Sequence, residues 1–429
     1  MNMSDLAAQI RELGRRARAA ATQLALASRA DKDRALRAMA DALLAARTEI
    51  IAANAADLAA GEKAGLSKAM LDRLRLDEKR LAAMADGVRA VADLPDPVGR
   101  VQREWSHANG IVFRKVAVPI GVIGIIYESR PNVTSDAASL CLKAGNAVIL
   151  RGGSESLRTN LAVAAALSRG LVASGLPADA VQLIPVADRE AVKHLAALDE
   201  FVNLIIPRGG RGLIEAVVAS ARVPVIKHYD GICALYVDAA ADLAMAEQIA
   251  LNAKCQRPGV CNAIETLLVH RAVAEKFLTT AGRALLERGV QLRVDAAAHA
   301  ALGPSLNSQH STLITAAQPQ DFRTEFLDLI LAVKVVDSLD AAIAHIEENG
   351  SHHSDAIVTA DAAAAEKFLN AVDSATVYWN ASTRFTDGSE FGFGAEIGIS
   401  TDRLHARGPM GLEELTTYKY VIRGTGQVR

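Results

Sequence analysis

The segment Lys254–Asn262 places two cysteines, Cys255 and Cys261, among cationic side chains. A cysteine acts as a nucleophile only as its thiolate, and nearby cations lower the pKa of the thiol. Lys254 and Arg257 supply such charge locally. Cys261 follows a Pro-Gly turn and precedes an apolar run, which predicts an accessible position just before a strand. From these residues alone two interpretations stay open: ordinary buried cysteines, or a thiol that attacks a substrate.

Two glycine-containing turns could bind the phosphates of a nucleotide, because each follows an apolar run and precedes a helical pattern. The turns are Arg151-Gly152-Gly153-Ser154 and Gly209-Gly210. Backbone N–H groups at a helix start attract anions, and glycine lets a ligand approach the backbone closely. Arg151 with Ser154 would suit the extra phosphate of NADP, although the neighbouring Glu155 opposes it. No Gly-x-Gly-x-x-Gly motif follows a strand, so plain tight turns are the alternative.

A third polar cluster contains His345, His352 and His353 with nearby carboxylates. Such residues are common metal ligands. The spacing, however, places His345 near the end of a helix, and consecutive residues of an extended segment point to opposite sides. We therefore expect these histidines to form hydrogen bonds that shape a loop, and we expect no metal site.

The elements that must position these residues follow an α/β pattern. Apolar residues recur at three- and four-residue steps through the first ninety or so positions, which predicts helices, until the turn-rich Leu94–Gly99. Beyond it, short apolar runs alternate with helical stretches. The expected strands are Ile111–Val118, Gly121–Ile126, Asn146–Leu150, Val181–Ile184, Phe201–Ile206, Val223–Ile226 and Ala234–Val237. This order predicts a parallel sheet that binds ligands beyond the carboxyl ends of its strands.

A second α/β region is expected from about Asp238. It has a helix over Leu243–Ala253 and strands at Ile264–Val269 and around Leu331–Val336. The segment 383–411 is too rich in glycine for long elements and too apolar for a linker. We expect it to form a loop or hairpin that packs on another part of the protein or on another subunit.

Composition excludes several classes of protein. The 429 residues are 51% hydrophobic and 22% charged, so the chain is not disordered. Lys and Arg total 47 against 49 Asp and Glu, a balance that argues against a surface for nucleic acid or anionic membrane. Four scattered cysteines do not make a disulfide scaffold. With neither a secretory signal nor a long apolar run, we expect a soluble, cytoplasmic protein.

Several segments together have a more specific pattern. They are Tyr127–Val133, Arg257–Thr266, Val336–Ile357 and Gly408–Leu412. In this order they closely resemble the gamma-glutamyl phosphate reductase family of the aldehyde dehydrogenase superfamily. The likeness extends from the N-terminal helices to about Tyr418. No kinase-length extension follows, so the chain resembles the stand-alone reductases and not the fused kinase–reductases.

The resemblance implies an α/β, aldehyde dehydrogenase-like fold with a Rossmann-type cofactor domain, a second α/β catalytic domain and a small oligomerisation arm. Its expected boundaries are 1–117 and 141–238 for the cofactor domain, 239–382 for the catalytic domain, and 118–140 and 383–429 for the oligomerisation or hairpin segments. The family also implies a homo-oligomer and a functional association with glutamate 5-kinase.

The implied activity is NADPH-dependent reduction of L-glutamyl 5-phosphate to L-glutamate 5-semialdehyde and phosphate, the second step of proline biosynthesis. By the resemblance, Cys261 forms a thioester, and Asn132 with a backbone amide forms the oxyanion hole. The cofactor would lie against Arg151, Gly152, Gly153, Ser154, Gly209 and Gly210. Glu325 matches a glutamate that contacts the nicotinamide-side ribose. Arg130 and Arg403 are candidates for binding the glutamate moiety.

One departure from the superfamily fits this activity. Hydrolytic aldehyde dehydrogenases have a glutamate base near the end of the first domain, but Ile226–Ile232 contains none. Those enzymes need a base for water to attack the thioester, whereas water would waste an acyl phosphate substrate. The rival hypotheses are a relative that acts on an acyl-CoA or another acyl phosphate, a thiol hydrolase, and a nucleotide-binding scaffold without activity.

Overall fold

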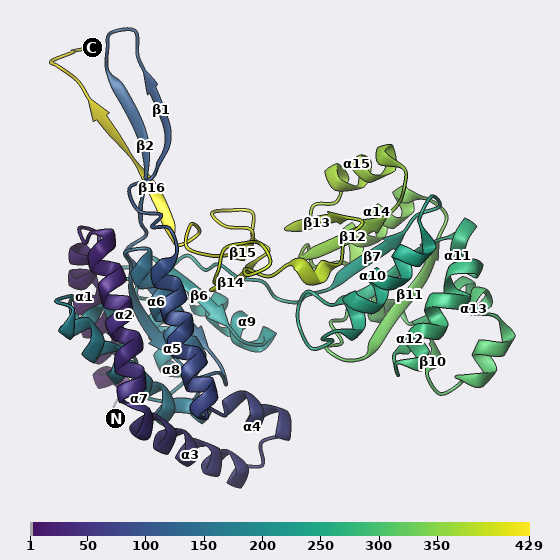
Figure 1. Ribbon diagram of the computed structural model, residues 1–429, viewed down its shortest axis with the longest axis horizontal. Coiled ribbons are helices and arrows are strands. Elements are labelled where there is room, and N and C mark those ends of the chain that lie inside the picture. The colour runs from purple at the N-terminus through teal and green to yellow at the C-terminus, as the bar shows by residue number, and fades with distance from the viewer. Residues whose placement is uncertain (1–2) are drawn as a thin grey trace. The chain divides into compact units, whose positions relative to one another are not determined.

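The computed structural model describes residues 3–429, which divide into two compact units. The first unit comprises the chain through Lys227 together with Gly392–Gly398 and Met410–Arg429; the second comprises His228–Phe391 and Ile399–Pro409. Each unit contains its own parallel sheet with flanking helices (Figure 1). Residues 1 and 2, with which the expected cofactor domain begins, lie outside the described residues.

The first unit begins with helices, as the spacing of apolar residues predicts. They are α1 (Met3–Leu24), α2 (Arg29–Ala45), α3 (Arg47–Lys63), α4 (Lys68–Leu74) and α5 (Glu78–Asp93). Ser28 caps α2: its side chain accepts from the N–H of Asp31, whose carboxylate accepts from the N–H of Ser28. This reciprocal pair satisfies two donors that the helix start leaves open. Leu36 and Met39 of α2 are fully buried, and α2 packs on α5.

A parallel sheet of order β5-β4-β3-β6 lies at the centre of the first unit. Its strands are β3 (Val122–Tyr127), β4 (Ala147–Arg151), β5 (Val181–Leu183) and β6 (Leu204–Arg208). The accompanying helices are α6 (Asn132–Lys143), α7 (Leu157–Ala173), α8 (Glu190–Ala196) and α9 (Arg211–Ser220). Every residue of β3 and β4 is buried. Burial on both faces explains why these strands appear in the sequence as continuous apolar runs.

Two strands expected in this sheet differ from the prediction. Val223–Ile226 is reduced to a single parallel bridge, between Val225 and Ile205 of β6. Pro224 has no N–H to donate, so this segment cannot continue a ladder. The run expected at Ala234–Val237 is a real strand, β7 (Cys233–Val237), but it pairs within the sheet of the second unit. An apolar run predicts burial and does not identify its partner strand.

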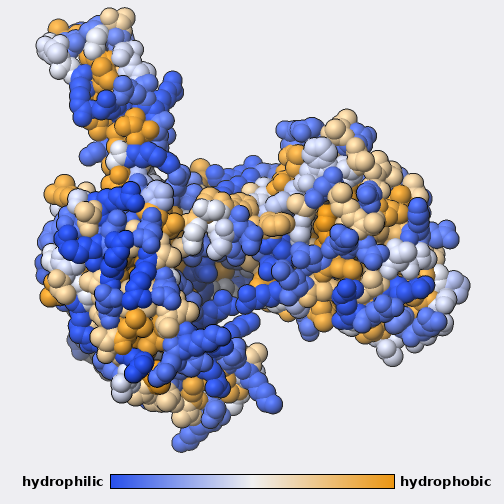
Figure 2. All heavy atoms as spheres, in the orientation of Figure 1, coloured by the Kyte–Doolittle hydropathy of each residue, from blue (hydrophilic) through white to orange (hydrophobic). Residues whose placement is uncertain are grey.

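An antiparallel arm also belongs to the first unit. It consists of β1 (Val101–Ser106), β2 (Val112–Pro119) and β16 (Thr416–Arg423) in the order β1-β2-β16. Tyr420 and Ile422 of β16 are exposed, and Figure 2 shows apolar side chains among hydrophilic ones along the arm.

The expected domain boundaries differ from this arrangement. Residues 118–140, expected in the oligomerisation segment, supply β3 and α6 of the first unit, and β1 with most of β2 comes from within 1–117. The fully buried β3 pairs with β4 on one side and β6 on the other, so it forms part of the central sheet.

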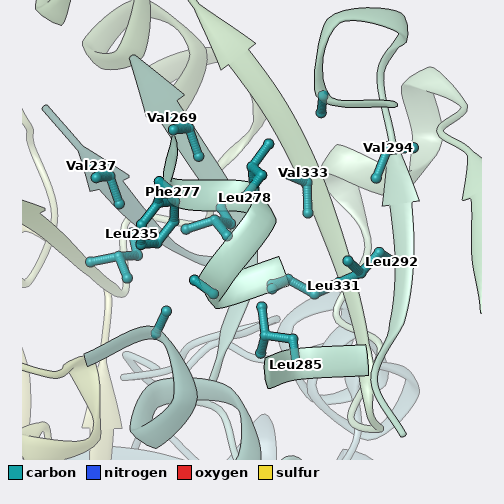
Figure 3. Close-up of a cluster of buried hydrophobic side chains, with 14 of the residues drawn as sticks. Leu235, Val237, Val269, Phe277, Leu278, Leu285, Leu292, Val294, Leu331 and Val333 are labelled. Carbon is teal, nitrogen blue, oxygen red and sulfur yellow. The ribbon is translucent and has the colours of Figure 1, made fainter. Parts of the chain in front are cut away.

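The second unit contains a larger sheet, parallel throughout, of order β10-β9-β11-β8-β7-β12-β13. Besides β7, its strands are β8 (Ile264–His270), β9 (Gln291–Val294), β10 (Ile314–Ala316), β11 (Ile330–Val336), β12 (Ser354–Val358) and β13 (Thr376–Trp379). Its helices are α10 (Leu243–Cys255), α11 (Arg271–Phe277), α12 (Arg283–Glu287), α13 (Ala296–Gln309), α14 (Leu339–Asn349) and α15 (Ala362–Ala371). Leu235, Leu278 and Val333 meet in the core between sheet and helices (Figure 3).

The glycine-rich segment 383–411 contains only short elements, as expected. They are the 3₁₀ turn η5 (Thr383–Phe385) and the paired strands β14 (Gly398–Ser400) and β15 (Gly408–Met410). Across the described chain, every helix lacks either the length or the apolar character needed to cross a membrane.

Candidate active site

Cys261 lies in the loop between α10 and β8, and its side chain is half-buried. The sequence predicted this position just before a strand. Gly231 packs directly against the cysteine: a Cβ added at Gly231 would lie 2.0 Å from the carbonyl oxygen of Cys261 and 2.5 Å from its Cα. Only glycine leaves room for this backbone approach. The neighbour therefore restricts the backbone that carries the thiol.

Buried polar side chains lie behind Cys261. The Cys233 thiol donates to the carbonyl oxygen of Cys261 at 3.2 Å and lies 3.6 Å from Nδ1 of His353. The same nitrogen is 2.9 Å from the Ser354 hydroxyl. Burial raises the pKa of Cys233 well above its ordinary value and lowers the pKa of His353 to about 3. Both groups are therefore neutral, and Cys233 supports the loop instead of reacting.

The other two cysteines, Cys141 and Cys255, are poor nucleophiles. Burial raises the pKa of the half-buried Cys255, and the fully buried Cys141 is a packing residue, as predicted. Lys254, expected to supply positive charge to a thiolate, is itself fully buried. Its ammonium donates to the carboxylate of Glu265 at 2.5 Å. The charge of Lys254 still lowers the pKa of Cys255, as expected, but burial has the larger effect and raises that pKa.

Glu325 lies in the same unit and shares its surroundings with these groups. Burial raises its pKa, while a hydrogen bond from the backbone N–H of Gly231 and the charge of Lys254 act in the opposite direction. Burial also raises the pKa of Glu265 to about 7. Because Gly231 abuts Cys261, the structure brings Glu325 and the thiol, two of the predicted site residues, into one neighbourhood.

Asn132 belongs to the first unit and begins α6. Its side-chain nitrogen is exposed and donates to the carboxylate of Asp136, one turn later, at 2.7 Å. An amide nitrogen has two N–H donors, so one stays available for a further acceptor. Asp136, whose pKa is raised chiefly by burial, holds the amide in this orientation.

The predicted cofactor residues lie at the carboxyl edge of the first sheet. Gly152 and Gly153 follow β4, and Gly209 and Gly210 follow β6. A Cβ at Gly152 would lie 2.1 Å from the side-chain nitrogen of Asn160. The N–H of Gly210 donates to the carboxylate of Glu128 at 3.0 Å. Both glycine turns are thus shaped by close contacts, as a binding loop requires.

A cavity of about 1010 Å³ opens at this edge. Its cationic lining residues are Arg151, Arg158, Arg189 and Lys193. Arg151 is almost fully buried and donates to the carbonyl of Ala187 at 2.9 Å, and its Nε is buried without a partner among the described residues. The carboxylate of Glu155, which seemed to oppose a phosphate, accepts two hydrogen bonds from Ser129, at 2.6 and 2.7 Å. The lining also contains the carboxylates of Asp57 and Glu190, which pair with Arg158 and Lys193. Arg151 and Arg189 are therefore the cations best placed to meet a dinucleotide phosphate.

The three histidines do not converge. His345 lies within α14 near Lys334, whereas His353 is buried behind Cys261. The imidazole of His352 contacts the carbonyl of Asp373 at 2.9 Å. In residues 3–429, no three His, Cys, Asp or Glu side chains are grouped as they would be around a metal ion.

Sequence reasoning missed Gly231, Cys233 and Arg384, the last of which contacts the residue after Cys261. These residues are distant from Cys261 along the chain, so local spacing gave no signal. Of the arginines suggested for the glutamate moiety, Arg403 forms an ion pair with Asp373.

Known proteins resemble this chain over most of its length. The aldehyde dehydrogenase family model matches residues 4–321. The gamma-glutamyl phosphate reductase of Opitutus terrae is 58% identical over 427 residues, covering 99% of both chains, and that of Paramagnetospirillum magneticum is 54% identical over 429 residues, covering 100% of this chain and 99% of its own.

Among solved structures, the gamma-glutamyl phosphate reductase of Thermotoga maritima superposes with a TM-score of 0.93 at 43% identity, covering 98% of this chain and 99% of its own. With this coverage the match extends through both units and includes the glycine turns of the first and the cysteine loop of the second. The chain therefore belongs to the aldehyde dehydrogenase family and, within it, to the gamma-glutamyl phosphate reductases.

Proposed function

We propose that this chain catalyses the NADPH-dependent reduction of L-glutamyl 5-phosphate to L-glutamate 5-semialdehyde and phosphate, the second step of proline biosynthesis. Membership of the reductase family supports the reaction. The observation that carries the proposal is a half-buried cysteine whose backbone is restrained by Gly231 and Cys233. A restrained, accessible thiol is what covalent acyl transfer needs.

Cys261 is the nucleophile in this proposal. Its thiolate attacks the acyl carbon, a carbon–sulfur bond forms, and the bond from that carbon to the phosphate oxygen breaks, with its electron pair leaving on phosphate. The oxyanion of the tetrahedral intermediate accepts hydrogen bonds from a backbone N–H of the cysteine loop and from the second N–H of Asn132. One such donor is typically worth about 3 kcal/mol of barrier. The product of this stage is a thioester on Cys261.

Bound NADPH would supply the hydride that reduces this thioester. The thiohemiacetal on Cys261 then releases the aldehyde and regenerates the thiolate. Water must stay out, because hydrolysis of the thioester would return glutamate. The lack of a glutamate in Ile226–Ile232 fits this requirement, since the base that activates water in hydrolytic relatives is missing from that position.

The family implies a nicotinamide cofactor, and we propose that it is NADPH. Residues that would hold it are Arg151, Gly152, Gly153, Ser154, Gly209 and Gly210, with Glu325 at the nicotinamide-side ribose. Arg151 and Arg189, which line the cavity at the carboxyl edge of the first sheet, support a cofactor with an additional phosphate. Ser129 supports the same choice, because it holds the Glu155 carboxylate through two hydrogen bonds.

The proposal also includes a homo-oligomer that assembles through the arm, a functional association with glutamate 5-kinase, and a cytoplasmic location. The exposed Tyr418, Tyr420 and Ile422 of β16 support assembly through the arm. A reducing compartment would preserve the four cysteines, all of which are thiols in this structure.

The test measures phosphate-dependent reduction of NADP with glutamate semialdehyde, the reverse reaction. Cys261→Ala should abolish turnover while NADPH still binds, and the matched Cys255→Ala should retain most of the activity. Full activity of Cys261→Ala would refute the nucleophile. Activity with coenzyme A in place of phosphate would favour an acyl-CoA reductase, and turnover of an acyl substrate without nicotinamide would favour a hydrolase.

A further inference from the structure

Arg384, on the 3₁₀ turn η5, places its guanidinium beside the cysteine loop. Its Nη1 donates to the side-chain oxygen of Asn262, the residue that follows Cys261. Its Nε donates to the side-chain oxygen of Gln256, on the other side of the same loop, at 3.0 Å. Because both bonds use atoms of the guanidinium fork, the position of the charge is fixed relative to the loop.

The turn that carries this arginine is anchored to the same loop. The Thr383 hydroxyl donates to the carbonyl oxygen of Asn262 at 2.7 Å, and the side-chain nitrogen of Asn262 donates to the carbonyl of Thr386 at 2.8 Å. Thr383, Thr386 and Asn262 are all buried. The cysteine loop and η5 are therefore held together by several hydrogen bonds, and Arg384 keeps its place beside the thiol.

A second guanidinium belongs to the cysteine loop itself. Arg257 lies between α10 and β8, on the same loop as Cys261, and is exposed. Burial, followed by the charge of Arg257, lowers the pKa of Arg384, while Asp387 and Cys261 act in the opposite direction. Two guanidiniums close together repel one another, and an anion bound between them relieves the repulsion. This arrangement is that of an anion site next to a nucleophile.

We propose that Arg384 and Arg257 bind the phosphoryl group of the acyl phosphate substrate at Cys261. The proposal rests on the proposed function and names the residues that recognise its leaving group. Guanidinium groups suit phosphate because their planar N–H pairs match two of its oxygens. As the bond between the acyl carbon and the phosphate oxygen breaks, negative charge grows on that oxygen, and the two cations stabilise it without transferring a proton.

The anion could instead be the α-carboxylate of glutamate, and the chemistry of the substrate decides between the two. In an acyl phosphate a single oxygen separates phosphorus from the carbon that the thiolate attacks. The α-carboxylate lies at the far end of the side chain. Because Arg384 bonds to the residue adjacent to Cys261, it is placed for the nearer anion.

The first test compares Arg257→Gln, which leaves the hydrogen bonds of Arg384 intact, with the wild type in the reverse reaction. We expect the KM for inorganic phosphate to rise about tenfold, the effect of losing about 1.4 kcal/mol of binding, and the KM for glutamate semialdehyde to change less than twofold. Arg283→Gln, on α12 and exposed, is the matched control and should change neither constant. A rise in the semialdehyde constant alone would assign the pair to the α-carboxylate, and no change in either would overturn the proposal.

The second test needs no turnover, so it separates this proposal from the proposed function. In a Cys255→Ala background, Cys261 is alkylated with iodoacetate, an anion, and with neutral iodoacetamide. We expect the rate with iodoacetate, divided by the rate with iodoacetamide, to fall several-fold in both Arg257→Gln and Arg384→Lys. We also expect inorganic phosphate to slow alkylation of the background protein and of neither variant. If the ratio is the same in the background protein and in both variants, the site does not bind anions, and the proposal is wrong even if the enzyme is active. If the ratio differs but the protein does not reduce NADP with phosphate and glutamate semialdehyde, the anion site is supported and the proposed function is wrong.

Discussion

The two parallel sheets present their candidate sites at opposite edges. In the first unit the glycine turns and Arg151 follow the carboxyl ends of β4 and β6. In the second unit Cys261 precedes β8, while Cys233 begins β7 and His353 precedes β12, so these side chains lie at the amino edge. The rule that parallel sheets bind ligands at their carboxyl ends therefore predicts the first site and fails for the second.

The two edges also differ in their surroundings: one borders a cavity, and the other packs on buried side chains. The first borders an open cavity of about 1010 Å³ lined by small, apolar and charged residues of both signs. The second is backed by buried, hydrogen-bonded side chains, including Cys233 and His353. A cofactor must enter and leave, whereas a nucleophilic atom must stay in place. We therefore expect substitutions at the first edge to change affinity, and substitutions behind the second to change the rate of the chemical step.

Gly231→Ala should have the largest effect. Its Cβ would collide with the backbone of Cys261, 2.0 Å from the carbonyl oxygen, so the loop must move. A displacement of about 1 Å at a reacting group can cost about 100-fold in rate. We expect kcat to fall by roughly that factor while the Kd for NADPH, measured by fluorescence titration, changes less. Most residues proposed to hold the cofactor belong to the other unit, whereas Glu325 accepts a hydrogen bond from the N–H of Gly231.

Gly87→Ala is the control for this substitution. Gly87 lies in α5, and a Cβ added there meets no atom within 4 Å. In a helix interior alanine is favoured over glycine by up to about 1 kcal/mol, so this variant should keep full activity and gain thermal stability. Wild-type kcat in Gly231→Ala would mean that the loop tolerates the shift, and the contrast between the two edges would lose its main support.

At the first edge, Arg189→Gln should act on affinity alone. Arg189 lines the cavity, is exposed, and lies near enough to Arg151 that its charge helps to lower the pKa of that buried arginine. If these cations bind the additional phosphate of NADPH, the KM for NADPH should rise about tenfold. The KM for NADH and the saturated rate should stay within twofold. An equal rise for both cofactors would place Arg189 against a phosphate that the two share.

Features that are local in the chain could be predicted from the sequence. Gly152 and Gly209 were predicted to bind the cofactor because the chemistry of a strand-to-helix turn is local in the chain. Cys261 was predicted as the nucleophile from a Pro-Gly turn, a nearby cation and a resemblance to a family. The order of strands was less accessible, and β7 was expected in the wrong sheet because an apolar run does not specify its partner.

Contacts between distant segments account for the rest. Gly231 matters because it meets Cys261, and Arg384 matters because it meets Asn262; neither contact has a local signature. Lys254 is the opposite case, since its closeness in sequence to Cys255 and Cys261 suggested an electrostatic role. Its side chain points into the protein and pairs with Glu265, and its charge still lowers the pKa of Cys255. Nearness along the chain predicted charge near the thiol and could not predict the direction of the side chain.

The smallest effect is expected from a substitution behind the second edge, and it concerns stability. Burial lowers the pKa of His353 to about 3, far below the ordinary value near 6.5. As pH falls below 6.5 the unfolded chain takes up a proton at this residue and the folded chain does not. The stability that the neutral histidine provides is therefore complete above pH 6.5, and it is lost by roughly 1 kcal/mol per pH unit as the pH falls toward 3.

His353→Gln removes this titration, so its free energy of unfolding should lack that part of the acid dependence. Measured by urea denaturation at pH 7.5 and pH 5.5, the wild type should lose about 1 kcal/mol more than the variant. Asp355, whose pKa burial raises to about 6, titrates with the opposite sign: its stabilising protonated form is gained as pH falls. Because Asp355 is present in both proteins, it cancels in the difference. Equal pH dependence in the two proteins would mean that His353 is protonated in the folded protein. Water would then reach the side chains that support the cysteine loop, and the contrast with the open cavity at the first edge would be lost.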